Sequence, residues 1–413
     1  MEYIEGLGKR AKKASYSLAT AQTALKNTAL EYIAKELENN VALILQENKK
    51  DIDNAQQNGI SGQMIDRLAL NEKRIADMAT GVRKLIELND PVGVIDSEWT
   101  RPNGLKIGRM RVPLGVIAII FESRPNVTVD AAALCLKSGN AVILRGGKEA
   151  INSNLVLTEI MRKAIEKAGL DKNCINTVEN TDRQTATALM KLNKYVDVLI
   201  PRGGAGLIKA AVENATVPVI ETGTGNCHIF VDKSADLNMA AEIIVNAKTS
   251  RVSVCNAAES LVVHSSVAGE FLPVISKVLK EKDVEIKGCE KTCQIIDCVR
   301  AQEDDFYREY LDYVISCKIV DSVDEAIEFI NEHSTAHSEA IITEDNENAH
   351  KFQKEIDSAA VYVNASTRFT DGFEFGFGAE IGISTQKIHA RGPMGLEALT
   401  STKYIINGNG QIR

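Results

Sequence analysis

The chain has 413 residues, a formal net charge of −8, 44% hydrophobic residues and 25% charged residues. This length predicts two or three domains, because a domain averages roughly 150 residues. The composition is ordinary for a globular protein and excludes a disordered or fibrous chain. Duplex binding needs many phosphate contacts, and no Lys/Arg stripe offsets the acidic charge. We therefore expect a small-molecule substrate and no nucleic-acid partner.

The first ten residues and the cysteines indicate a compartment. MEYIEGLGKR carries two acids and no apolar run, so we expect no secretory signal. The longest apolar run, Val112 to Phe121, contains Pro113 and is too short to span a bilayer. Eight cysteines in a large chain of this kind indicate reduced thiols instead of a disulfide framework. We expect a cytoplasmic protein without a membrane partner.

Periodicity predicts a helical first segment followed by alternating strands and helices. From Tyr3 to about Leu88, apolar residues recur at three- and four-residue spacing, which predicts helices. The pattern changes at Asp90-Pro91, and residues 105–112 then alternate basic and apolar side chains like a half-exposed strand. The strands and helices expected next cover residues 115–121, 127–136, 141–144, 155–168, 175–178, 185–192, 196–200, 207–212 and 217–220.

A second alternating series follows residue 255. Alternation of this kind is typical of doubly wound parallel sheets, so we expect two α/β domains. Residues 402–406 form another β-like run, which can pair with the 105–112 segment as an arm. The elements expected in the second series cover residues 258–263, 271–280, 313–320, 323–330, 339–342 and 359–363.

Cys255 is the first candidate for chemistry. It follows a helical stretch, 239–248, and precedes a strand-like run. A nucleophilic cysteine reacts as the thiolate and needs nearby positive charge, which Arg251 and Lys248 can supply. The alternative is a small buried hydrophobic residue, which is the commoner state of an isolated cysteine.

Glu221 is the second candidate, at the end of an expected strand and before a glycine-rich turn. A carboxylate beside a thiol can act as a general base, although an exposed turn acid is an equal alternative. Cys227 and His228 adjoin, but neighbouring strand residues face opposite ways, which argues against a thiol–imidazole pair.

Asn126 is the third candidate, where a strand end meets a helix. Its amide can hold the oxyanion formed when a thiolate attacks a carbonyl. The alternative is an ordinary helix N-cap.

Two glycine turns follow strands and place backbone N–H groups and a cation at a helix start, as phosphate sites do. Neither matches G-x-G-x-x-G, so the Rossmann fingerprint is absent. The turns consist of Arg145-Gly146-Gly147-Lys148 and Pro201-Arg202-Gly203-Gly204-Ala205-Gly206.

Three cysteines, Cys289, Cys293 and Cys298, cluster without C-x-x-C spacing or a histidine pair. We therefore expect surface or core thiols here and no metal site.

Asn126, the glycine turns, Glu221 and Cys255, in this order and spacing, resemble the aldehyde dehydrogenase superfamily. Residues 373–397, FEFGFGAEIGISTQKIHARGPMGLE, are similar to a signature of the γ-glutamyl phosphate reductase family within it. Further family-like segments are 123–126, 221–228 and 253–257.

The resemblance implies an aldehyde-dehydrogenase-like α/β fold with two doubly wound domains and a small β arm used in oligomerisation. A cofactor-binding domain is expected over 1–95, 114–226 and 385–399. The catalytic domain is expected over 227–384. The arm is expected over 96–113 and 400–413.

The implied reaction is NADPH-dependent reduction of L-glutamyl 5-phosphate to glutamate 5-semialdehyde, the second step from glutamate to proline. Cys255 displaces phosphate and forms a thioester, and a thioester accepts hydride far more readily than a carboxylate. The oxyanion that follows meets Asn126 and the Cys255 N–H. A homo-oligomer and coupling to glutamate 5-kinase belong to the same expectation.

Several binding roles follow from the same resemblance. Lys148, with Arg145 nearby, stands where NAD-using relatives often place an acid against the adenosine ribose, so NADPH is expected. Glu309 stands where the superfamily has a cofactor-ribose acid. Bidentate guanidinium contacts suit a carboxylate and a phosphate. The candidates for these substrate contacts are Arg124, Arg251, Arg368 and Arg391.

Two rivals remain open. A non-phosphorylating aldehyde dehydrogenase would release the acyl group with water and would need Glu221 as base, so phosphate dependence separates it. A catalytically silent binding protein on this fold is disfavoured by the joint presence of Cys255, Asn126 and the turns.

Overall fold

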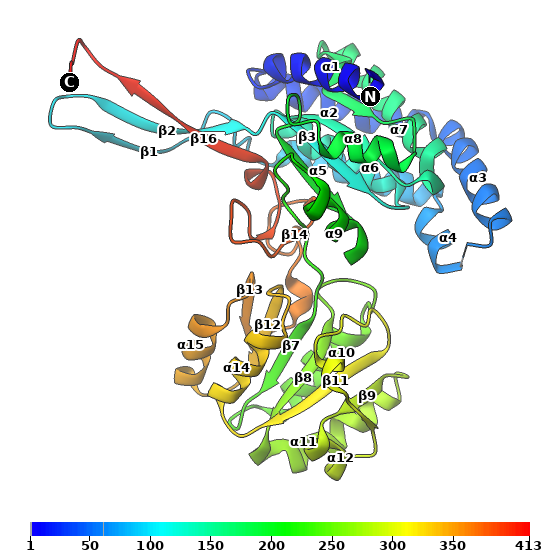
Figure 1. Ribbon diagram of the computed structural model, residues 1–413, viewed down its shortest axis with the longest axis vertical. Coiled ribbons are helices and arrows are strands. Elements are labelled where there is room, and N and C mark those ends of the chain that lie inside the picture. Colours follow the sequence, from blue (N-terminus) through cyan, green and yellow to red (C-terminus); the bar gives the residue numbers. More distant parts are fainter. Residues whose placement is uncertain (1, 61) are drawn as a thin grey trace. The chain divides into compact units, whose positions relative to one another are not determined.

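The computed structural model describes residues 2–60 and 62–413. These residues form two compact units, which are described separately (Figure 1). Unit 1 comprises the described residues within 1–222 together with 376–382 and 394–413. Unit 2 comprises 223–375 and 383–393.

Unit 1 begins with the expected helical segment and continues as an α/β layer. Its parallel sheet has four strands in the order β5-β4-β3-β6. Apolar side chains of this sheet and of α1 pack into one core that includes Leu7, Ile120 and Leu199. The helices are α1 (Glu2–Leu18), α2 (Thr23–Asn39), α3 (Val41–Gln57), α4 (Gly62–Leu68), α5 (Glu72–Glu87), α6 (Pro125–Lys137), α7 (Ile151–Ala168), α8 (Arg183–Met190) and α9 (Ala205–Asn214), and the strands are β3 (Val116–Phe121), β4 (Ala141–Arg145), β5 (Ile175–Thr177) and β6 (Val198–Arg202).

An antiparallel arm projects from unit 1 (Figure 1). It consists of β1 (Ile95–Thr100), β2 (Lys106–Pro113) and β16 (Thr400–Asn407), with β2 in the middle. Lys403 pairs with Met110, so the expected pairing of 402–406 with 105–112 is confirmed. Every residue of β1 is exposed.

Unit 2 is a seven-stranded parallel sheet covered by helices on both faces. The strand order is β10-β9-β11-β8-β7-β12-β13. Alternate residues of β7 divide between two cores: Ile229 packs with α10 and α11, and Phe230 packs with α14 and α15. The strands are β7 (Cys227–Val231), β8 (Ala258–His264), β9 (Glu285–Gly288), β10 (Val299–Arg300), β11 (Val314–Val320), β12 (Ser338–Ile342) and β13 (Ala360–Val363), and the helices are α10 (Leu237–Thr249), α11 (Ser265–Lys280), α12 (Glu290–Ile295), α13 (Glu303–Phe306), α14 (Val323–His333) and α15 (Asn346–Glu355).

The two doubly wound α/β units confirm the expected fold class. One expected strand, 217–220, is wrong. This segment makes a single parallel bridge, Leu199 with Val219, through the Pro218 carbonyl and the Ile220 N–H. Pro218 has no N–H to donate, so a longer ladder does not form there. The strands β9 and β10 were not among the expected elements, whereas β1 falls in the segment expected as a β arm, 96–113.

Candidate functional site

Cys255 lies on the short turn between α10 and β8, at the amino end of the unit 2 sheet, and its side chain is half-buried. The turn closes with a hydrogen bond from the Ala257 N–H to the Val254 carbonyl, 3.1 Å. After this turn the chain becomes fully buried as it enters β8. The thiol is therefore presented at the end of a rigid strand.

The glycine-rich turn before β7 packs directly against this thiol-bearing turn. A Cβ on Gly225 would lie 1.5 Å from the Cys255 carbonyl oxygen, so only glycine fits. The next strand residue, Cys227, donates its S–H to the same carbonyl at 3.2 Å. Burial strongly raises the pKa of Cys227, so it remains a neutral donor. The sequence singled out this segment because Glu221 precedes the glycine-rich turn. It did not reveal that Gly225 and Cys227 support Cys255.

Glu309 holds the glycine turn in place. Its carboxylate accepts a 2.7 Å hydrogen bond from the Gly225 N–H, and burial raises its pKa. This contact gives Glu309 a structural partner inside unit 2. The ribose role expected from the resemblance stays a prediction.

Two arginines lie near Cys255. Arg368 donates from Nη1 to the Asn256 side-chain oxygen and from Nε to the Ser250 hydroxyl at 3.1 Å. Burial lowers the pKa of Arg368, and the like charge of Arg251 lowers it further, whereas the Cys255 thiolate acts in the opposite direction. The charge of Asp371 also acts on Arg368, so charges of both signs lie around this turn, and the two guanidinium groups are the ones that can bind an anionic substrate.

Lys248 does not present a free positive charge. Its ammonium pairs with Glu259 at 2.5 Å, and both side chains are fully buried. Burial raises the pKa of Glu259 to about 7 and lowers that of Lys248. Glu259 also accepts the Leu311 N–H at 3.1 Å. The expectation that Lys248 supplies charge to Cys255 is therefore replaced by a buried pair that ties α10 to β8.

Arg391 is bound to a carboxylate. Its Nη2 lies 2.8 Å from the Asp357 side chain, and Lys387 pairs with the same group. Hydrogen bonds from Lys387 and then Arg391 lower the pKa of Asp357. Of the unit 2 candidates for anion binding, Arg251 and Arg368 lie near the thiol in this geometry, whereas Arg391 is engaged with Asp357.

In unit 1, both predicted glycine turns follow carboxyl ends of strands in the parallel sheet. The chain order β3-β4-β5-β6 and the sheet order β5-β4-β3-β6 place the reversal of winding between β3 and β6. Ligands of open α/β sheets bind at such a point. Arg145, at the end of β4, donates to the Thr181 carbonyl at 2.5 Å, but its Nε is buried without a partner. Lys148 is exposed.

The second glycine turn carries a carboxylate at the start of α9. Glu122, just after β3, accepts the Gly204 N–H at 3.2 Å, and a Cβ on Gly203 would meet its side chain at 2.6 Å. A carboxylate in this position accepts a hydrogen bond from an N–H group at the helix start, where a phosphate would otherwise bind. The turn at residues 145–148 offers the positive charges of Arg145 and Lys148, and it also has an acid beside it, because a Cβ on Gly147 would lie 2.5 Å from the Glu149 carboxylate and the charge of Glu149 acts on Arg145.

Asn126 is not the N-cap of α6, because that position belongs to Arg124. Its exposed side chain lies in the first turn, and its amide donates to Asp130 at 3.1 Å. Burial raises the pKa of Asp130 to about 6, against the effects of Asn126 and Arg202, which lower it. The alternative reading as an N-cap is wrong, and the side-chain amide is oriented by a carboxyl group.

The remaining candidates also divide between the units. Glu221 is half-buried and immediately follows the β6-associated bridge in unit 1. The unit 1 candidates are Arg124, Asn126, Arg145, Gly146, Gly147, Lys148, Arg202, Gly203, Gly204 and Glu221, and the unit 2 candidates are Arg251, Cys255, Glu309, Arg368 and Arg391.

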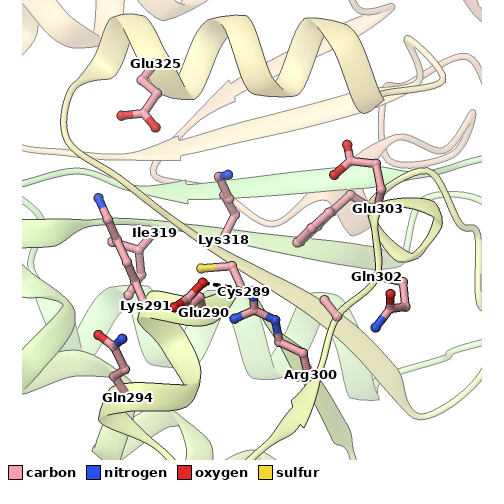
Figure 2. A pocket seen from close by; sticks show the side chains of 12 residues that line it. Cys289, Glu290, Lys291, Gln294, Arg300, Gln302, Glu303, Lys318, Ile319 and Glu325 are labelled. Atoms are coloured by element: carbon pink, nitrogen blue, oxygen red, sulfur yellow. Dashed lines mark hydrogen bonds and ion pairs between the residues drawn. The ribbon is translucent and has the colours of Figure 1, made fainter.

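A separate pocket of about 680 Å³ lies in unit 2, at the carboxyl ends of β9, β10 and β11 (Figure 2). Figure 2 shows the Cys289 sulfur near Lys318, with the Glu290–Arg300 ion pair below them. Within residues 2–60 and 62–413, no group of three or more His, Cys, Asp or Glu side chains is arranged to hold a metal. No helix among the same residues is long and apolar enough to cross a membrane.

The fold and this arrangement of residues agree with the comparison to protein families. The aldehyde dehydrogenase family model matches residues 5–313 and 292–405, and the chain belongs to this family. Among its relatives, γ-glutamyl phosphate reductase of Clostridium perfringens (strain SM101) is 61% identical over 407 residues, 98% of each chain. The same enzyme of Caldicellulosiruptor saccharolyticus is 59% identical over 409 residues, again 98% of each.

Solved structures extend the likeness. Gamma-glutamyl phosphate reductase of Thermotoga maritima superposes with a TM-score of 0.98 and 51% identity, covering 99% of both chains. An engineered glycolyl-CoA reductase with bound NADP+ has a TM-score of 0.70 at 17% identity, covering 97% of this chain and 96% of that one. The second likeness shows the shared fold alone.

Proposed function

We propose that this protein reduces L-glutamyl 5-phosphate to L-glutamate 5-semialdehyde with NADPH and releases phosphate, as the second step of proline biosynthesis from glutamate. The observation that carries the proposal is the Cys255 turn with Arg251 and Arg368 beside it. Full-length identity of 61% to a relative named for this reaction supports it.

In the proposed mechanism, the Cys255 thiolate attacks the acyl carbon of the substrate and phosphate leaves, which forms a thioester. Arg251 and Arg368 stabilise the anionic substrate as it binds. When bound, NADPH supplies the hydride that the thioester carbon accepts. The Asn126 amide and the Cys255 N–H stabilise the resulting oxyanion, whose collapse releases the aldehyde and regenerates the thiolate.

Residues of unit 1 fit the cofactor. The unpartnered, buried Arg145 Nε and the exposed Lys148 offer positive charge at a strand-to-helix turn, where a phosphate of the cofactor is favoured. Aldehyde dehydrogenases use NAD(P), and we assign NADPH to this chain because Lys148 can neutralise a 2′-phosphate. We propose that the Arg202 turn also contributes to cofactor binding, through Gly203 and Gly204 and alongside Glu122.

Lys148→Glu is expected to shift cofactor preference towards NADH. The acid would repel the 2′-phosphate and accept hydrogen bonds from a free ribose hydroxyl, so the NADPH/NADH ratio of kcat/KM should fall roughly ten- to hundredfold. Steady-state kinetics with both cofactors measure this ratio, and Lys191→Glu, on the same unit, serves as a charge-matched control. Equal use of both cofactors by the unmodified protein would contradict the assignment.

Glu221→Gln is expected to cost less than the roughly 10²- to 10⁴-fold that essential general-base steps contribute. The acyl group arrives activated as a phosphate, so no base is needed to release it with water. Glu221 then serves to orient the site or to relay a proton. Phosphate-dependent oxidation of glutamate semialdehyde measures the effect. A Gln variant that is folded, binds NADPH and has no activity would place Glu221 in the core chemistry.

A single assay tests the whole proposal. NADP+ reduction by glutamate semialdehyde should require phosphate, because phosphate is the acyl acceptor in this direction. Turnover at the same rate without phosphate would favour the non-phosphorylating alternative, in which water releases the acyl group.

The proposal extends to the setting of the reaction. We infer a cytoplasmic homo-oligomer that uses the β1-β2-β16 arm in assembly and is functionally coupled to glutamate 5-kinase, because an acyl phosphate hydrolyses readily in water. The exposed Trp99 and Tyr404, whose rings meet edge to face at 6.1 Å, provide an apolar surface on the arm.

A further inference from the structure

Two thiols lie in contact at an edge of the unit 2 sheet that the proposed reaction does not use. The sulfur atoms of Cys293, on α12, and Cys298, just before β10, are 3.3 Å apart, and both side chains are half-buried. A disulfide has an S–S distance of about 2.05 Å, so closure requires a movement of little more than an ångström. We propose that Cys293 and Cys298 are a reversible dithiol–disulfide site, oxidised by small disulfides of the glutathione class.

The local backbone makes room for this pair. A Cβ on Gly288 would lie 2.6 Å from the Cys298 sulfur, so glycine at the end of β9 creates the space that the sulfur occupies. Besides Cys298, the Cys293 thiol contacts the Gly288 carbonyl at 3.4 Å. The helix α12 has six residues and β10 has two. Short elements at a sheet edge adjust at low cost, which allows the two sulfurs to approach.

The other cysteines of the fold lack this arrangement. Cys135, Cys174 and Cys317 are buried, and burial raises the pKa of each. Cys289 lines the neighbouring pocket (Figure 2). Burial acts to raise the pKa of Cys289, but hydrogen bonds from Thr292 and the Ile319 N–H and the charge of Lys318 lower it overall. Cys289 is therefore a competing thiol and a useful internal comparison.

The site is distinct from the Cys255 region. Cys255 precedes the amino end of β8, whereas Cys289 and the thiol pair lie beside Gly288, at the carboxyl end of β9 in the same parallel sheet. Gly288, at the end of β9, is level with Cys317 in β11 and, through β11, with Leu261 in β8, so the thiol pair lies two strands away from β8 and further along the strand direction than Cys255. Oxidation of the pair does not consume the catalytic thiol.

The chemistry balances as two exchange steps. The Cys293 thiolate attacks oxidised glutathione, which forms a mixed disulfide and releases one glutathione thiolate. Cys298 then attacks the Cys293 sulfur, which closes the internal disulfide and releases the second glutathione. The two thiols lose two electrons and two protons, and one oxidised glutathione becomes two reduced molecules. Burial and the Cys293 thiol raise the pKa of Cys298 to about 12, which is consistent with attack by Cys293 first.

Tryptic mapping tests the proposal directly. Cleavage after Lys291 and Arg300 places both thiols in one peptide, residues 292–300, and Cys289 in another, residues 288–291. The full chain is equilibrated in reduced and oxidised glutathione, alkylated and digested. We expect peptide 292–300 without alkylation, with a mass lower by two hydrogens, in the unmodified chain and in Cys289→Ser. Cys293→Ser and Cys298→Ser should both lose this species.

The same measurement in urea tests whether the folded structure favours the disulfide, beyond the effect of the short sequence separation between the two cysteines. The equilibrium constant for closure should be at least about tenfold larger in the folded chain than in the unfolded chain, because folding holds the sulfurs together. Equal constants would overturn the proposal. A glutathione adduct confined to Cys289, with both thiols of 292–300 still alkylated, would overturn it as well.

Discussion

Cys255→Ser is expected to reduce turnover of glutamyl phosphate, or of semialdehyde with phosphate, by about 10⁴-fold or more. A serine hydroxyl is almost wholly protonated at neutral pH, whereas a cysteine thiol ionises far more readily and its thiolate is the nucleophile. The replacement removes no packing, because serine matches the shape of cysteine and Cys255 is half-buried. NADPH binding, measured by fluorescence titration, should be unchanged.

Two other cysteines serve as matched controls. Cys227→Ser keeps a donor for the Cys255 carbonyl, now a hydroxyl in place of the 3.2 Å S–H contact, and should retain most activity. Cys293→Ser, beside the carboxyl end of β9, should be indistinguishable from the unmodified chain in turnover. Near-normal activity of Cys255→Ser, or labelling of a different cysteine by a substrate-mimicking electrophile, would show that the nucleophile lies elsewhere.

Much of the fold was predictable because apolar residues recur along the sequence at regular helix or strand spacing. The helices before residue 88 and the alternating runs of both units follow from apolar spacing, which tracks the buried faces of α1, α2 and β3. The segment 217–220 failed because an apolar run resembles a strand whether or not its backbone pairs. Pro218 argued against a strand in the sequence, because a proline has no N–H to donate within a β-ladder.

Contacts made between distant residues were beyond prediction from the sequence. Glu309 and Gly225 are 84 positions apart, and Asn256 and Arg368 are 112 apart. No local pattern encodes either pair. The sequence identified Cys255, Asn126 and the glycine turns by residue type and order. It did not reveal that Lys248 is neutralised by Glu259, because eleven positions separate a helix residue from a strand residue that it meets only in the fold.

Asn126→Ala is expected to lower kcat/KM by roughly 10²- to 10³-fold if its amide stabilises the oxyanion, which is the range for loss of one such donor. The loss should fall mainly on kcat, because the oxyanion develops only as the reaction proceeds. Stability should change little, since Asn126 is exposed and does not cap α6. Steady-state kinetics and thermal melting measure the two effects separately.

Asp130→Ala distinguishes a direct role of the amide from an indirect one. This variant removes the 3.1 Å hydrogen bond between the two side chains but leaves the Asn126 amide in place. If the amide itself meets the oxyanion, Asp130→Ala should lose less than about tenfold, the cost of a less well oriented donor. Equal losses in the two variants would mean that Asn126 acts through its bond to Asp130, and the proposed oxyanion contact would then be wrong.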